Sequence, residues 1–151
     1  MASNTTENTN ERLILRVILS EIAQVPPWIE RLASDNAIPQ SVQFASNLCL
    51  EEVLSNIILH GSGGMDGKHG EQEGALVVSF STPREGCFLF VVEDEAPDFN
   101  PLDQPELPAL NPNEAMRIGG QGLRLIHEFA DKLEYERRPA GNRLKMYFSA
   151  V

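Results

Sequence analysis

Two pairs of short apolar segments, each pair joined by a brief polar connection, constrain the fold of this 151-residue chain most strongly. Residues 75–81 and 87–93 form the first pair, and residues 133–138 and 143–149 form the second. Their β-branched and aromatic side chains are typical of strands, and connections this short make neighbouring strands antiparallel. The sequence therefore predicts two β-hairpins.

Helical periodicity marks three further segments. Residues 41–60 form the clearest predicted helix, because apolar residues recur on one face at the spacing of the α-helix. That stripe consists of Leu50, Val53, Leu54, Ile57 and Ile58. Residues 28–34 and 119–132 show weaker versions of the same pattern, and Pro26-Pro27 requires the first of them to begin or bend there.

The order of the predicted elements defines the fold class. A strand at residues 13–19 precedes the helices, so the chain reads strand, two helices, two strands, loop, helix and two strands. This order favours an α+β two-layer sandwich, in which a mixed, mainly antiparallel sheet carries helices on one face. We expect residues 1–11 to be a disordered tail and residues 12–151 to form a single domain.

Two segments with little periodicity predict loops. Residues 61–74 are polar and rich in glycine, and residues 96–118 contain five prolines. A loop as long as the second is usually functional or disordered when it lies inside a compact domain.

Composition and charge exclude several classes of protein. A net charge of -10 argues against a general nucleic-acid binder, which needs clustered Lys and Arg. No apolar run approaches the ~18 residues of a membrane span, and no signal peptide is visible, so we expect a cytoplasmic protein without a membrane partner. Cys49 and Cys87 lack metal-ligand spacing and predict two buried, reduced thiols.

Glu52 and Asn56 are four residues apart, so they share one face of the predicted helix. An asparagine oxygen is a suitable neutral ligand for Mg²⁺, and a nearby carboxylate can act as a base. Both residues point away from the apolar stripe, however. Taken alone, this segment is explained equally simply by a solvated Glu–Asn pair on the helix surface.

Asp94 ends the apolar strand that contains Phe88, Phe90 and Val92. A carboxylate at that point could accept a hydrogen bond from the exocyclic amine of adenine, which would select adenine over guanine. The alternative is a solvated strand end or a cap for the turn.

Gly119, Gly120, Gln121 and Gly122 open the last predicted helix. Glycines permit close backbone approach, and the free N–H groups at a helix start bind phosphate. No Lys-Ser or Lys-Thr pair follows, so the segment is not a P-loop. Arg117 could contact a terminal phosphate. A glycine-rich cap without a ligand, and an exposed arginine, are the alternatives.

In this order, the three segments resemble the GHKL (Bergerat-fold) ATPase superfamily and, within it, the anti-sigma-factor serine/threonine-protein kinases of bacterial partner-switching systems. Residues 52–61 are similar to the N-box of that family, and residues 94–102 to its D-x-G-x-P-F-D-P segment. Residues 117–126, with Gly141 and Asn142, resemble its last glycine box and terminal hairpin. Ala96 departs from the pattern, because the superfamily has glycine there.

The resemblance implies a site for ATP and Mg²⁺ with Glu52 as the catalytic base, Asn56 as the metal ligand and Asp94 on adenine. The nucleotide-binding residues that it implies are Asn56, Asp94, Ala96, Phe99, Arg117, Gly119, Gly120, Gln121, Gly122 and Leu123.

The resemblance also implies a function. A kinase of this type phosphorylates a STAS-domain anti-anti-sigma factor, binds a sigma factor and forms a homodimer. Two alternatives remain open. One is a nucleotide-gated protein-binding regulator with little or no kinase turnover. The other is an α/β interaction domain whose site has decayed, for which Ala96 is the main reason.

Overall fold

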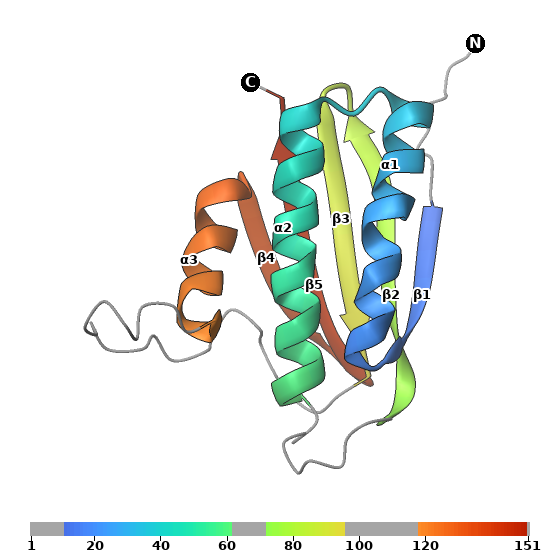
Figure 1. The fold of residues 1–151 in the computed structure, drawn as a ribbon, viewed down its shortest axis with the longest axis vertical. Coiled ribbons are helices and arrows are strands. Elements are labelled where there is room, and N and C mark those ends of the chain that lie inside the picture. Colours follow the sequence, from blue (N-terminus) through green and yellow to red (C-terminus); the bar gives the residue numbers. More distant parts are fainter. Residues whose placement is uncertain (1–10, 62–71, 96–117, 151) are drawn as a thin grey trace.

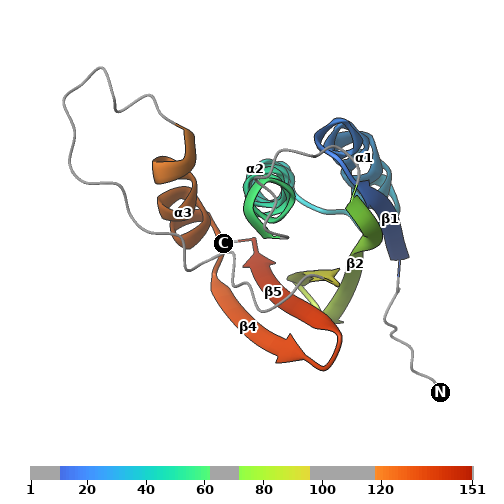
Figure 2. The ribbon, with the colours of Figure 1, turned by 90° about the horizontal axis from the view of Figure 1, so that it is seen from below.

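The computed structural model describes residues 11–61, 72–95 and 118–150. Within these ranges, a five-stranded sheet forms one layer and α-helices cover one of its faces (Figures 1 and 2). The strands are β1 (Glu11–Val17), β2 (Gln72–Arg84), β3 (Cys87–Asp94), β4 (Lys132–Arg138) and β5 (Gly141–Ser149). The helices are η2 (Leu19–Gln24), α1 (Val25–Asn36), α2 (Gln40–Asn56), η3 (Ile57–Gly61) and α3 (Ile118–Phe129).

The predicted two-layer α+β fold is confirmed. The strand order is β1-β2-β3-β5-β4, and each neighbouring pair of described strands is antiparallel. The two predicted hairpins supply the pairs β2–β3 and β4–β5, and β3–β5 joins them. Most of the predicted tail and both long predicted loops fall on residues outside the described ranges, so the single-domain division stays a prediction.

The prolines determine how α1 begins. Pro26 and Pro27 lie in its first turn, where a missing backbone N–H breaks no intrahelical hydrogen bond. The helix therefore begins at Val25, next to the Pro26-Pro27 pair where the sequence predicted a start or a bend, and a 3₁₀ turn, η2, leads into it. Ala37 ends it in the left-handed conformation, with φ of 54°.

Both hairpin turns are tighter than the sequence predicted. β2 continues to Arg84, so only Glu85 and Gly86 form the first turn. In the second hairpin, Gly141 and Asn142 were expected in the turn but are the first residues of β5. They belong to the strand because Asn142 pairs with Asp94 on one side and Arg137 on the other.

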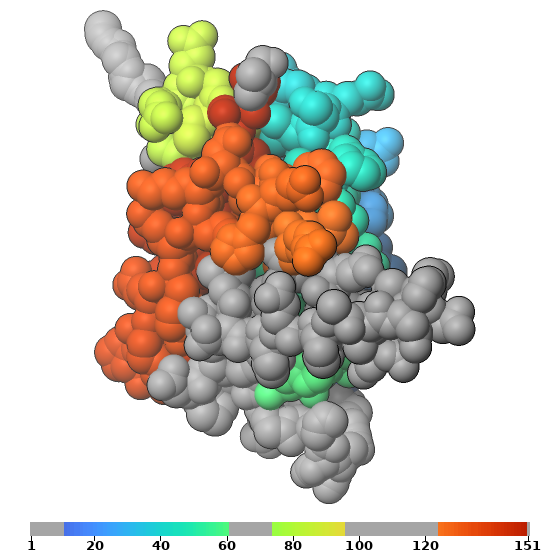
Figure 3. Space-filling view, turned by 90° about the vertical axis from the view of Figure 1, so that its left-hand side faces the viewer, coloured from blue at the N-terminus to red at the C-terminus, as the bar shows by residue number. Residues whose placement is uncertain are grey.

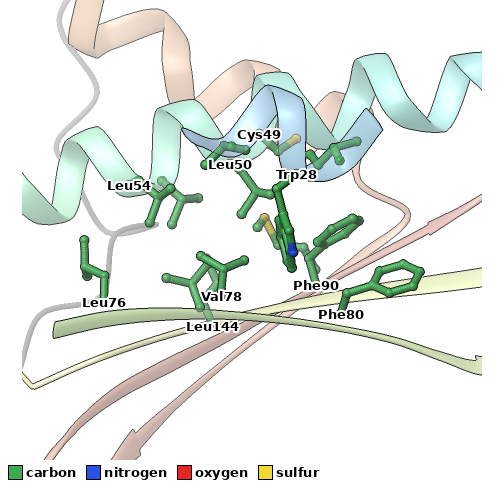
Figure 4. Close-up of a cluster of buried hydrophobic side chains, with 14 of the residues drawn as sticks. Trp28, Cys49, Leu50, Leu54, Leu76, Val78, Phe80, Phe90 and Leu144 are labelled. Atoms are coloured by element: carbon green, nitrogen blue, oxygen red, sulfur yellow. The ribbon is translucent and has the colours of Figure 1, made fainter. Parts of the chain in front are cut away.

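The core lies between the sheet and the helices (Figure 4). Trp28 of α1 meets Phe90 of β3 edge to face, with ring centroids 6.1 Å apart, and Phe80 lies 5.1 Å from the same ring. Leu50 and Leu54 of α2 are fully buried above the strands. This packing anchors α2 against the sheet and fixes which of its faces remains available to a site.

Both cysteines are buried free thiols, as predicted. Burial, followed by the charge of Glu52, raises the pKa of the Cys49 thiol to about 12. In the part of the chain that the structure describes, no helix is both long and apolar enough to cross a membrane.

Candidate functional site

α2 places Glu52 and Asn56 near its C-terminal end. The side chain of Glu52 is half-buried, and Asn56 is only 6% exposed. The interpretation of the two as a solvated surface pair is therefore wrong for Asn56. α3 flanks α2, as the edge-to-face contact of Phe44 with Phe129 near the other end of α2 shows.

Asn56 carries an unsatisfied polar atom. Its Nδ2 is buried and has no hydrogen-bond partner among the described residues. A buried donor without an acceptor costs about 1–3 kcal/mol, so packing alone does not account for this amide. A phosphate oxygen would supply the acceptor, and the amide oxygen is of the type that Mg²⁺ prefers. The residue therefore fits a site for a nucleotide phosphate with its metal ion.

Glu52 and Glu51 lie on different faces of α2. Glu51 is exposed and lines a pocket of about 400 Å³ that η2, α1 and α2 enclose, together with Asn47 and Ser55. Glu52 lies outside that pocket. Its pKa is raised, first by burial and then by the charge of Glu51. A carboxylate with a raised pKa is a stronger base, which suits the role predicted for Glu52.

Asp94 is buried at the end of β3, with 4% of its surface exposed. The Asn142 Nδ2 donates a hydrogen bond to Asp94 Oδ1 over 2.9 Å, and the Arg138 Nη2 donates to the Asp94 carbonyl oxygen over 3.1 Å. A solvated strand end is therefore not what the structure shows. Gly141 makes this arrangement sterically feasible, because a Cβ there would lie 1.8 Å from the same carbonyl oxygen.

Asn142 is the residue whose role the sequence did not reveal. It is 2% exposed, and its Oδ1 accepts hydrogen bonds from the Tyr135 hydroxyl and from Arg137 Nη1, the latter over 3.2 Å. The sequence placed Asn142 in a turn, and nothing local indicates a partner 48 residues away. The β3–β5 register, which brings the two together, is a tertiary property.

α3 supplies the predicted phosphate-binding backbone. It begins at Ile118, so Gly119, Gly120, Gln121, Gly122 and Leu123 all lie in its first two turns, as the predicted helix start required. The first N–H groups of any helix lack intrahelical partners. Figure 1 shows that the beginning of α3, the C-terminal end of α2 and the end of β3 point toward the same end of the molecule. Figure 3 shows α3 between β4 and α2.

The structure thus brings Asp94, Gly141 and Asn142 into direct contact and sets Glu52 and Asn56 on the neighbouring helix. Ala96, Phe99 and Arg117 lie outside the described residues, so their predicted contacts stay predictions.

Comparison with known proteins identifies the family of this chain. The family model of the histidine kinase-like ATPase domain matches residues 18–148, and the chain belongs to this family. The serine/threonine-protein kinase BtrW of Bordetella bronchiseptica is 26% identical over 119 residues, which is 79% of each protein.

Solved structures agree on the fold. A crystal structure of the RsbU and RsbW domains of a Mycobacterium tuberculosis protein superposes with a TM-score of 0.62 at 11% identity, covering 93% of this chain and 32% of that one. The histidine kinase domain of a blue-light-activated kinase from Erythrobacter litoralis gives 0.50 at 14% identity, covering 89% and 61%. This chain therefore spans about a third of the first structure and less than two thirds of the second.

The family match confirms the predicted GHKL-type ATPase family. Together the matches support the assignment of this chain as an ATP-binding, kinase-like regulator.

Proposed function

We propose that this protein is an ATP-dependent serine/threonine kinase and anti-sigma factor that phosphorylates a STAS-domain anti-anti-sigma partner. The observation that carries the proposal is the pair of buried polar side chains at one end of the fold. Asn56 offers an amide without a described partner, and Asp94 offers a buried acceptor held by Asn142. The similarity to BtrW, a serine/threonine-protein kinase, supports the same chemistry.

The nucleotide would lie between the strand end and the helices. The Asp94 carboxylate would accept a hydrogen bond from the exocyclic amine of adenine. The backbone N–H groups at the start of α3 would bind the phosphates. Ala96 and Phe99 would line the adenine side, and Arg117 would contact the terminal phosphate. Asn56 would hold Mg²⁺, which supplies charge neutralisation at the β- and γ-phosphate oxygens when bound.

Glu52 would act as the base. It would take the proton from a serine or threonine hydroxyl of the partner, whose oxygen attacks the γ-phosphorus in line while the bond to the leaving ADP oxygen breaks. Its half-buried position and raised pKa suit proton abstraction near neutral pH. The net charge of -10 is compatible with a basic surface on the sigma factor, and we expect a homodimer.

Phosphate transfer from labelled ATP·Mg²⁺ to a STAS-domain protein tests the proposal, with ATP affinity measured in parallel by calorimetry. Glu52→Gln should reduce transfer by roughly 10²–10⁴-fold while ATP still binds. Glu51→Gln is the matched control, because Glu51 lies next in sequence but lines the pocket on the other face of α2; its transfer rate should stay within about twofold of wild type.

The outcomes separate the alternatives. Tight ATP binding without transfer by the wild type would favour a nucleotide-gated regulator. Failure of the wild type to bind ATP·Mg²⁺ at all would refute the proposed site. Equal losses in the Glu52 and Glu51 variants would show that Glu52 is not the base.

A further inference from the structure

We propose that Tyr135, Arg137 and Asn142 are positioning residues that hold Asp94 as a hydrogen-bond acceptor and thereby set the choice of nucleotide base. This inference rests on the proposed ATP site. It concerns side chains of β4 and β5, the C-terminal hairpin.

The sheet register places these residues in one row. Asp94 of β3 is paired with Asn142 of β5, and Asn142 is paired with Arg137 of β4. Paired residues project from the same face of a sheet, and Tyr135, two residues before Arg137, projects from that face as well. Asp94 and Asn142 are 4% and 2% exposed, so the row lies on the buried face that carries the helices.

The hydrogen bonds determine the orientation of the Asn142 amide. Its Oδ1 accepts from the Tyr135 hydroxyl and from the Arg137 guanidinium, and its Nδ2 donates to Asp94 Oδ1 over 2.9 Å. A guanidinium has no acceptor atom. Reversing the amide would therefore set its NH₂ against Arg137 and its carbonyl oxygen against the Asp94 carboxylate. Two donors thus hold the amide so that its own donor faces Asp94.

This orientation constrains the chemistry of Asp94. A carboxylate that receives an N–H at one oxygen is held in one rotamer, and an ionised carboxylate only accepts hydrogen bonds. Each carboxylate oxygen can accept more than one hydrogen bond, so the contact with Asn142 does not by itself exclude a ligand donor at Asp94. Adenine presents an amine at C6, whereas guanine and hypoxanthine present an oxygen. At the C6 position itself, only the amine of adenine can donate to the carboxylate.

The row therefore predicts a specific signature. If Asn142 and its two donors only stabilised the fold, their loss would weaken the binding of all nucleotides by the same factor. If they position Asp94, their loss allows the carboxylate to rotate, and the preference for a 6-amino base weakens. The ratio of the Kd for GTP to the Kd for ATP should then fall.

Calorimetric Kd values for ATP, GTP and ITP, measured on the full chain with Mg²⁺, test this signature. Tyr135→Phe removes a single hydroxyl and should lower the GTP-to-ATP ratio by roughly threefold to tenfold, as expected for one lost hydrogen bond. Asn142→Ala should lower it further, and ITP should follow GTP because it shares the 6-oxo group. Tyr147→Phe is the matched control. Its hydroxyl contacts Glu134 over 3.3 Å within the same hairpin, so its ratio should match wild type.

The outcomes separate this inference from the proposed function. If the wild type does not bind ATP, both fail. If the wild type binds ATP and Asp94→Asn abolishes binding, the adenine contact stands. A ratio that stays within twofold in Tyr135→Phe, or a parallel loss for all three nucleotides, would then overturn the positioning role alone. Should Asn142→Ala fail to fold, Tyr135→Phe decides the result.

Discussion

Replacing Gly141 with alanine would insert a methyl group between β5 and the end of β3. The added Cβ would lie 1.8 Å from the carbonyl oxygen of Asp94 and 3.0 Å from the Cα of Glu95. Contacts below 3.0 Å essentially never occur at a Cβ, so the two strands must separate by at least 3.0 minus 1.8, or 1.2 Å. Packing space, rather than backbone conformation, therefore requires glycine at this position.

The size of the effect follows from the hydrogen bond beside it. If the separation adds 1.2 Å to the 2.9 Å between Asn142 Nδ2 and Asp94 Oδ1, the distance becomes about 4.1 Å, beyond hydrogen-bonding range. Loss of a hydrogen bond to a charged group costs about 1.5–3 kcal/mol. We expect Gly141→Ala to lower the free energy of unfolding by that amount and to weaken ATP binding by roughly 10–100-fold.

Urea denaturation and calorimetric ATP titration measure the two effects. Gly86→Ala is the control, because Gly86 has φ of +77° and an added Cβ there meets nothing within 4 Å. That variant should lose about 1 kcal/mol of stability through backbone strain and keep its ATP affinity. A Gly141→Ala protein with wild-type stability and an ATP Kd within twofold of wild type would refute this reasoning.

Three further predictions concern the core and α2. Phe90→Ala should cost about 3–5 kcal/mol in urea denaturation, because this fully buried ring contacts Trp28, Phe80 and Phe148; a loss below about 1 kcal/mol would contradict the packing. Cys49, whose thiol pKa is about 12, should react with a thiol reagent at pH 8 only after unfolding.

The pKa of Glu52 is raised in the folded protein, so this acid adds stability below its unfolded pKa, and that stability is lost as the pH rises through the folded value. Glu52→Gln should therefore have a higher urea midpoint than wild type at pH 7, with the difference absent below about pH 4. An equal or lower midpoint at pH 7 would contradict this.

The fold could be predicted from the sequence where local patterns are strong. The α2 stripe and the two hairpins depend on nearby residues, and the structure confirms all three elements. The errors lie at boundaries that tertiary pairing determines. Gly141 and Asn142 have the composition of a turn, yet they join β5 because β3 supplies hydrogen-bond partners on one side and β4 on the other.

The candidate site was predictable in part for the same reason. Helix geometry alone put Glu52 and Asn56 on one face. The burial of Asn56 was not visible, because the pattern of α2 alone does not show what packs over its polar face. The Asn142 contact to Asp94 was not visible either, since a shift of one residue in the β3–β5 register would turn Asn142 to the other face of the sheet.

The proposed site divides its tasks between two kinds of structure, and the division has a physical basis. Phosphates carry charge on several oxygens, so helix-terminal N–H groups and the Asn56 amide can bind them with modest demands on geometry. Discrimination between an amine and an oxygen at one position of the base requires an acceptor in a fixed orientation. The wrong base is then disfavoured because a buried polar group stays unpaired in its complex. The sheet provides that rigidity through the row from Asp94 to Arg137. Substitutions in this row should therefore change which nucleotide binds, whereas substitutions of Glu52 should change whether the bound nucleotide is turned over.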